Sequence, residues 1–212
     1  MFASLIIQMP RHRPSLRGRL RLISFTLLVL VVLTSCAAPP TLKGTTLDPS
    51  GPAPNFTLTD QSGQPFTLSE QQGKVTVLYF GFTSCPDICP AELSSLAAAM
   101  RDLGNDADAI QVALVSLDPE RDTPERLAQY VSAFDPRFVG LRGDEATLEP
   151  IIKDYGVYRA RRELTGSALG YTIDHSGFVY MIDKAGRWRS VMAGGGPVAD
   201  LAHDLRILAR ER

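Results

Sequence analysis

The sequence predicts an α/β domain with a mixed central sheet flanked by helices. From residue 75 to residue 155, buried strands alternate with helices, which is the order that α/β sheets require. A β-hairpin precedes this alternation, and a second hairpin and a helix follow it. The run Val75–Phe82 is apolar, β-branched and aromatic with almost no polar interruption. Such a run is typical of a strand covered on both faces in the middle of a sheet.

Residues 1–35 are predicted to be a lipoprotein signal peptide and not part of the fold. Arginines precede the apolar stretch Leu22–Leu33, which is shorter than the roughly 20 residues that span a bilayer. The sequence Leu33-Thr-Ser-Cys36 resembles a bacterial lipoprotein cleavage box, in which Cys36 becomes the lipid-modified first residue. A plain secretory signal or an uncleaved anchor is the alternative. The protein is therefore expected to be exported and anchored through a lipid to the membrane, on its extracytoplasmic (periplasmic) side.

The rest of the chain is predicted to be a tether, residues 36–54, and one domain, residues 55–212. The tether is rich in proline and poor in apolar residues. The formal net charge of −1 gives no reason to expect a nucleic acid as a partner. Export places the chain in an oxidising compartment, where an unguarded pair of cysteines is expected to form a disulfide.

The elements follow from local patterns. Alternating residues flank the turn Asp60–Gly63, which indicates a hairpin, and Thr123 followed by Pro124 is a strong helix start. Arg159–Gly170 has no periodicity and is predicted to be a loop. The expected strands are Phe56–Thr59, Pro65–Leu68, Ile110–Leu117, Phe138–Leu141, Phe178–Ile182 and Trp188–Met192. The expected helices are Glu92–Leu103, residues 124 to about 134, Asp144–Tyr155 and Val198–Leu208.

Two cysteines, Cys85 and Cys89, follow the central strand at the end where open α/β sheets place their sites. Pro90 would disrupt a helix interior, so it is expected at the first helical position, with Cys89 just before it. Cys85–Cys89 would then be a tight loop at a helix N-terminus, which favours thiolates. The alternative is a pair of cysteines in an ordinary structural disulfide.

A third ligand is sought among the histidines. His175 lies in the segment Tyr171–Gly177, predicted to be a loop that leads into a strand close to the central one, and Asp174 and Ser176 could orient its imidazole. A histidine satisfied within its own loop is the alternative. His203 lies in the last helix and is interpreted as a surface residue. Two thiolates and an imidazole suit Cu(I), or Cu(II) with a further ligand, and zinc is also possible.

Three motifs in combination resemble the Sco/SenC family over about residues 50–210: Phe80–Leu93, Ser116–Pro124, and Asp174–Ser176 followed by Met181–Gly186. The resemblance implies a membrane-tethered protein with a thioredoxin-like fold that helps to assemble the CuA centre on subunit II of cytochrome c oxidase. It implies that Cys85, Cys89 and His175 are copper ligands. The segment Asp118–Pro124 looks like part of the family signature, but it is assigned no ligand. Many members use an uncleaved transmembrane helix, whereas a lipidated Cys36 is expected to anchor this chain.

Three functional interpretations follow. The first is a copper metallochaperone, which is not an enzyme and whose copper donor and thiol reductant the sequence does not identify. The second is a thiol–disulfide oxidoreductase with Cys85 and Cys89 as its redox pair, reducing partner disulfides such as that of the CuA cysteines. The third is a peroxiredoxin-like peroxidase, suggested by Ala53–Asp60 followed by a thiol after the core strand. The peroxidase needs a single cysteine and leaves His175 without a role.

Overall fold

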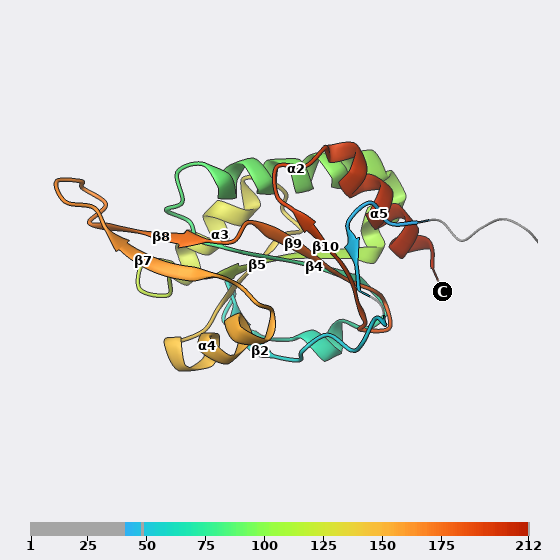
Figure 1. The fold of residues 1–212 in the computed structure, drawn as a ribbon, viewed down its shortest axis with the longest axis horizontal. Coiled ribbons are helices and arrows are strands. Elements are labelled where there is room, and N and C mark those ends of the chain that lie inside the picture. Colours follow the sequence, from blue (N-terminus) through green and yellow to red (C-terminus); the bar gives the residue numbers. More distant parts are fainter. Residues whose placement is uncertain (1–40, 48, 212) are drawn as a thin grey trace, which may run out of the picture. The chain divides into compact units, whose positions relative to one another are not determined.

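An eight-stranded mixed sheet with the strand order β1-β10-β9-β4-β5-β6-β2-β3 forms the centre of the fold (Figure 1). Its central strand β4, Val75–Gly81, pairs in parallel with β5, Ile110–Ser116, and antiparallel with β9, Phe178–Ile182. All residues of β4 are buried, as expected of a strand covered on both faces. The predicted α/β class with a mixed central sheet is confirmed.

This computed structural model describes residues 41–47 and 49–211, which belong to one compact unit beginning at Thr41. The predicted signal peptide and Cys36 lie outside these residues. Within the described ranges, every helix is too short or too polar to cross a membrane.

Apart from β1, which was not predicted, the other strands of the main sheet and the helices follow the predicted order. The other strands of the sheet are β1 (Thr45–Thr46), β2 (Thr57–Asp60), β3 (Pro65–Thr67), β6 (Val139–Arg142) and β10 (Trp188–Ala193). The helices are α2 (Ile88–Leu103), α3 (Pro124–Ser132), α4 (Glu145–Asp154) and α5 (Val198–Arg210), with 3₁₀ turns at Leu68–Gln71 and Gly104–Ala109. β2 and β3 form the predicted N-terminal hairpin ahead of the central strand.

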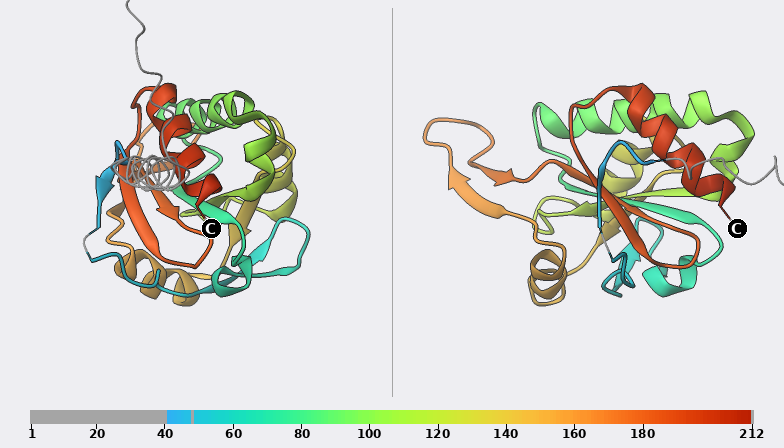
Figure 2. Two further views of the ribbon diagram at one scale, coloured as in Figure 1. Left: turned by 90° about the vertical axis from the view of Figure 1, so that its right-hand side faces the viewer. Right: turned by 45° about the vertical axis from the view of Figure 1, so that its right-hand side comes forward.

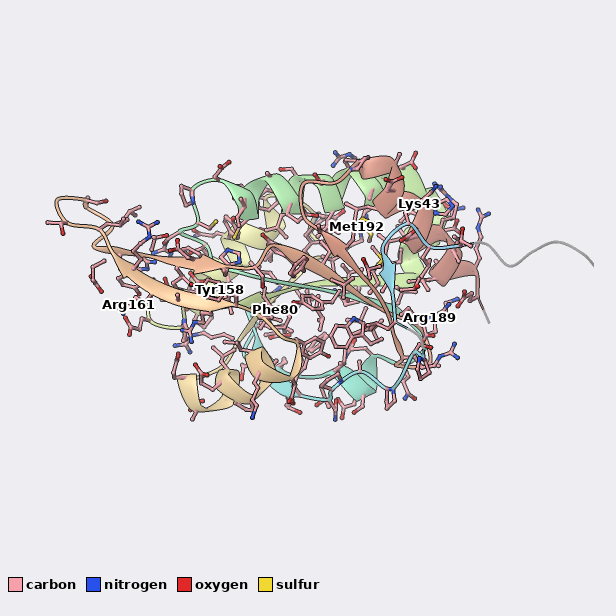
Figure 3. The ribbon with its side chains drawn as sticks, viewed as in Figure 1. Lys43, Phe80, Tyr158, Arg161, Arg189 and Met192 are labelled. Carbon is pink, nitrogen blue, oxygen red and sulfur yellow. The ribbon has the colours of Figure 1, made fainter. Side chains whose placement is uncertain are left out.

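Two hydrophobic cores lie on opposite faces of the sheet. Helices α2, α3 and α5 cover one face, and α4 covers the other (Figures 1 and 2). Successive side chains of β4 alternate between the faces, so Tyr79 packs with α2 while Phe80, labelled in Figure 3, packs on the side of α4. This alternation aims Tyr79 at the helix that carries Cys89.

The segment Arg159–Gly170 is not the loop that the sequence predicts. Residues Arg159–Glu163 form strand β7, which pairs antiparallel with β8, Tyr171–His175, in a separate two-stranded sheet. This hairpin projects from the rest of the domain (Figure 1). Its strand β7 is arginine-rich and largely exposed, so it lacks the apolar alternation by which strands are recognised.

Residues that the sequence assigns to the tether take part in the fold. Strand β1 pairs with β10, and the N–H groups of Lys43 and Gly44 donate to the buried Asp204 carboxylate at 2.8 and 2.9 Å. Ala53 N–H donates to the Gly186 carbonyl at 2.9 Å. The folded unit therefore starts before residue 55. Backbone hydrogen bonds hold this segment, and its proline-rich composition gave no sign of them.

Candidate metal centre

The two cysteines lie where the sequence places them, at the end of β4, but the helix begins earlier than predicted. Helix α2 starts at Ile88, so Cys89 and Pro90 are its second and third residues. The first amide to bond within the helix is Ala91 N–H, which donates to the Asp87 carbonyl at 3.3 Å. Because Pro90 lies in the first turn, where N–H groups have no intrahelical partner, its missing donor does not weaken the helix.

The two sulfurs have different environments. Cys85 is 8% exposed and Cys89 is fully buried, and both are free thiols. The neighbouring Cys89 side chain lowers the pKa of Cys85 to about 4, although burial opposes the shift. Cys89 N–H also donates to the Cys85 sulfur, at 3.4 Å. The neighbouring Cys85 side chain, together with burial, raises the pKa of Cys89. Cys85 is therefore the thiolate of the pair at neutral pH.

His175 comes to this pair from a strand and not from a loop. It is the last residue of β8, and its Nε2 lies 3.4 Å from the Cys89 sulfur. Its Nδ1 lies 3.0 Å from the carbonyl oxygen of Ser176, which can only accept a hydrogen bond. Nδ1 is therefore the donor to this carbonyl, and Nε2 is the ring nitrogen that faces the sulfurs. This is the arrangement expected of a metal-ligating histidine with a carbonyl as its outer partner.

The three side chains form one cluster of possible ligands. One sulfur from each cysteine and one ring nitrogen of His175 all lie within 4.8 Å of one another. Two sulfurs and an imidazole form a soft donor set, which matches the preference of Cu(I), with Zn²⁺ as the competing ion. The donor set therefore fits a soft metal ion.

Two aromatic rings pack against the imidazole. The ring centroid of Phe82 lies 5.7 Å from that of His175, and the ring centroid of Tyr79 lies 6.4 Å from it, both edge to face. Tyr79 is fully buried, its hydroxyl has no hydrogen-bond partner among the described residues, and burial followed by the neighbouring Cys89 raises its pKa. Because both rings are buried, they keep water away from the imidazole on the side that they cover.

Sequence reasoning was partly wrong about what orients His175. Asp174 makes no hydrogen bond to the imidazole, because its carboxylate pairs with Arg162 on the facing strand at 2.9 and 3.1 Å. Ser176 does orient the ring, but through its backbone carbonyl, because its hydroxyl accepts Tyr158 N–H at 3.2 Å. His203 lies on α5, where its Nδ1 is 3.0 Å from Asp204 Oδ1, and it is not part of the cluster.

Two buried carboxylates near the cluster were missed. Glu92, one turn after Cys89, accepts Gly195 N–H at 2.8 Å, and burial raises its pKa. Asp122 is fully buried and accepts hydrogen bonds from Thr83 and Ser116. The motif that contains Asp122 was the sequence feature that could have indicated a role near the cluster, although its acidic residues looked equally suited to a turn or a helix cap.

Fold and cluster together define a thioredoxin-like domain that carries two cysteines and a histidine beside its central strand. The chain belongs to the SCO1/SenC family, because the family model of that description matches residues 45–210. The fold and family predicted from the sequence are thereby confirmed.

Relatives and solved structures agree with this assignment. A SCO2-like protein of Rickettsia prowazekii is 39% identical over 63% of this chain and 65% of its own length, so the chain spans slightly less than two thirds of that relative. The structure of Bradyrhizobium japonicum ScoI with copper bound matches with a TM-score of 0.67 and 37% identity, over 74% of this chain and 99% of that one. Apo Sco1 from Thermus thermophilus matches with a TM-score of 0.71 and 34% identity, over 81% of this chain and 99% of that one.

Proposed function

We propose that this protein binds one copper ion through Cys85, Cys89 and His175. The observation that carries the proposal is the convergence of two sulfurs and one ring nitrogen within 4.8 Å. Cys85 supplies a thiolate, and the Nδ1–H of His175 is engaged by a carbonyl, which leaves Nε2 to bind a metal. Copper bound to the related ScoI supports copper over zinc.

The test is a copper titration of the reduced protein. Wild type should bind one equivalent of Cu(I). Cys85→Ser or Cys89→Ser should remove most of this affinity, because each substitution deletes a soft anionic ligand. His175→Ala leaves both sulfurs, so Cu(I) binding should weaken while the absorption and paramagnetic resonance spectra of the Cu(II) complex change more. His203→Ala is the matched control and should change neither. Unchanged copper binding and spectra in His175→Ala would remove His175 from the site.

We further infer that the copper is delivered to the CuA centre on subunit II of cytochrome c oxidase. Membership of the SCO1/SenC family supports this recipient. Lipidation of Cys36 would hold the protein at the extracytoplasmic face of the membrane, where such a recipient is reached. The test is transfer of Cu(I) from the loaded protein to a soluble CuA domain. Failure of copper to leave the loaded protein in the presence of reduced CuA cysteines would argue against delivery.

A thiol–disulfide oxidoreductase is the second candidate, and the asymmetry of the two cysteines favours it. Cys85 is slightly exposed, and its pKa is lowered to about 4, as in an attacking thiolate, whereas Cys89 is buried behind it. Reduction of a disulfide-bonded CuA domain by the copper-free dithiol protein tests this activity. If His175→Ala reduces the domain as fast as wild type, while wild type binds no copper, the oxidoreductase is the better assignment. The peroxidase interpretation gains no comparable support.

A further inference from the structure

The loop Asp118–Asp122, between β5 and α3, contacts both halves of the metal centre although it supplies no ligand. On the cysteine side, the Asp122 carboxylate accepts Thr83 Oγ1–H at 2.5 Å and Ser116 Oγ–H at 2.6 Å. Thr83 N–H also donates to it, at 3.2 Å. Thr83 lies two residues before Cys85. The buried carboxylate therefore fixes the path of the chain between β4 and the first sulfur.

On the histidine side, Arg121 contacts β8. Its Nε donates to Asp118 at 2.5 Å, and its Nη1 donates to the carbonyl oxygens of Leu169 and Tyr171 at 3.1 and 3.0 Å. Its guanidinium carbon lies 3.7 Å from the centroid of the Tyr171 ring. The hydroxyl of Tyr171 donates to Asp118 at 2.7 Å. Arg121 and Asp118 thus both bind Tyr171, the first residue of the strand that ends at His175.

The contacts of Arg121 and Asp118 with Tyr171 matter for the position of His175 because of the topology. Strands β7 and β8 form their own two-stranded sheet, so the main sheet constrains His175 only from its C-terminal side, through β9, which begins at Phe178. The ring of Phe82 joins the two sides, with its centroid 5.8 Å from the Arg121 guanidinium and 5.7 Å from the His175 ring. Arg161, labelled in Figure 3, covers the other face of Tyr171 at 3.6 Å from its centroid and comes from the hairpin itself. Arg161 also bonds Glu120 of the loop at 3.0 Å, and Arg159 bonds Glu145 of α4 at 3.0 Å, so the hairpin sends two cations to the domain. Arg121 is the cation that the domain sends to the hairpin at this ring.

We propose that Arg121 is a positioning residue, which holds strand β8 so that His175 lies within bonding range of the metal held by Cys85 and Cys89. An arginine suits this role because its planar guanidinium can bond a carboxylate and two carbonyls while it stacks on a ring. Lysine would keep the charge but not this geometry. The copper readout below rests on the proposed function, whereas the first readout does not.

The first test uses the reduced, metal-free full chain. In wild type, nuclear Overhauser contacts between the rings of Phe82 and His175 should be present, since their centroids lie 5.7 Å apart. In Arg121→Ala these contacts should be lost, while contacts within β7–β8 remain. Arg121→Lys should weaken them, and it decides the matter if Arg121→Ala does not fold. Retention of full contacts in the folded Arg121 variants would overturn the proposal.

The second test is a double-mutant cycle on Cu(II) affinity. Arg121→Ala should lower the Cu(II) affinity toward that of His175→Ala. It should also shift the spectrum of the Cu(II) complex toward that of His175→Ala. If Arg121 acts through His175, adding Arg121→Ala to His175→Ala should change the affinity by less than about twofold. Effects that multiply in the double variant would show that Arg121 acts elsewhere and would overturn the proposal. If wild type binds no copper, the proposed function fails, and the ring contacts alone decide the role of Arg121.

Arg142→Ala is the matched control for both tests. Arg142 donates to the Pro119 carbonyl in the same loop at 3.1 Å and makes no hydrogen bond to β8. The Arg142→Ala variant should leave the contacts between the Phe82 and His175 rings, and the Cu(II) affinity, within about twofold of wild type. A loss in Arg142→Ala equal to that in Arg121→Ala would mean that any disturbance of the loop suffices, and this would overturn the specific role of Arg121.

Discussion

Gly81, the last residue of β4, lies against the buried sulfur of Cys89, and replacing it by alanine is a direct test of the packing around the site. A Cβ at this position would lie 2.8 Å from the Cys89 sulfur, 3.0 Å from Tyr79 Cε1 and 3.3 Å from Leu114 Cδ1. Non-bonded carbon atoms pack at about 3.5–4.0 Å, so all three contacts are too close. The added methyl group therefore has to displace its neighbours.

The cost follows from how little those neighbours can move. Cys89, Tyr79 and Leu114 are at most 1% exposed, so none can turn toward solvent. Overpacking of a filled core costs about 1–3 kcal/mol, and we expect Gly81→Ala to lower the free energy of unfolding by about 2 kcal/mol. Because the closest contact is to Cys89, the sulfur must shift relative to His175, and Cu(I) affinity should fall as well.

Urea unfolding of the reduced protein measures the first effect, and a competitive Cu(I) titration measures the second. Gly51→Ala is the matched control, since a Cβ at Gly51 meets no atom within 4 Å. This variant should unfold within about 0.5 kcal/mol of wild type. If Gly81→Ala is as stable as Gly51→Ala and binds copper as wild type does, the description of the space around Cys89 is wrong.

Three further predictions concern other parts of the chain. Cys36→Ser should prevent lipid attachment, so the precursor should accumulate or the mature protein should leave the membrane fraction, and a variant that is still acylated would contradict this. Oxidation should join Cys85 to Cys89, so thiol counting should find two new thiols on reduction, provided Cys36 is lipidated. Burial raises the pKa of the Glu92 carboxyl above 4.5, although the hydrogen bond from Gly195 N–H opposes the shift. The folded state therefore holds the carboxyl proton of Glu92 more tightly than the unfolded chain does. Stability should therefore fall as pH rises from about 4.5 through the raised pKa, and Glu92→Gln should remove this fall in urea unfolding; equal slopes would refute it.

The strongest sequence signals came from buried, regular elements. The apolar run of β4 predicted the central strand, and the cysteines that follow it predicted the edge at which the site lies. His175 was found because it directly precedes a strand expected to pair with β4, and β9 does so. Burial imposes periodicity on a sequence, so elements of the core can be recognised from it.

The missed features depend on contacts between distant polar groups. Strand β7 is stabilised by its pairing with β8 and by ion pairs such as that of Arg162 with Asp174, and neither leaves an apolar pattern. The Asp122 carboxylate reaches Thr83 across 39 residues, so its burial could not be inferred from a turn-like motif. The hydrogen bonds of Lys43 and Gly44 to Asp204 are likewise long-range. Such contacts are known only once the topology is known.

The hydrogen bond from His175 Nδ1 to the Ser176 carbonyl bears on how the cluster takes up a metal ion. With Nδ1 engaged by this carbonyl, Nε2 is the ring nitrogen left to bind an incoming ion. The pKa of Cys85 is lowered to about 4, so this sulfur has already lost its proton at neutral pH. The raised pKa of Cys89 leaves the buried thiol protonated. A soft cation that binds both sulfurs near neutral pH therefore displaces the proton of the buried thiol, and acidification opposes loading.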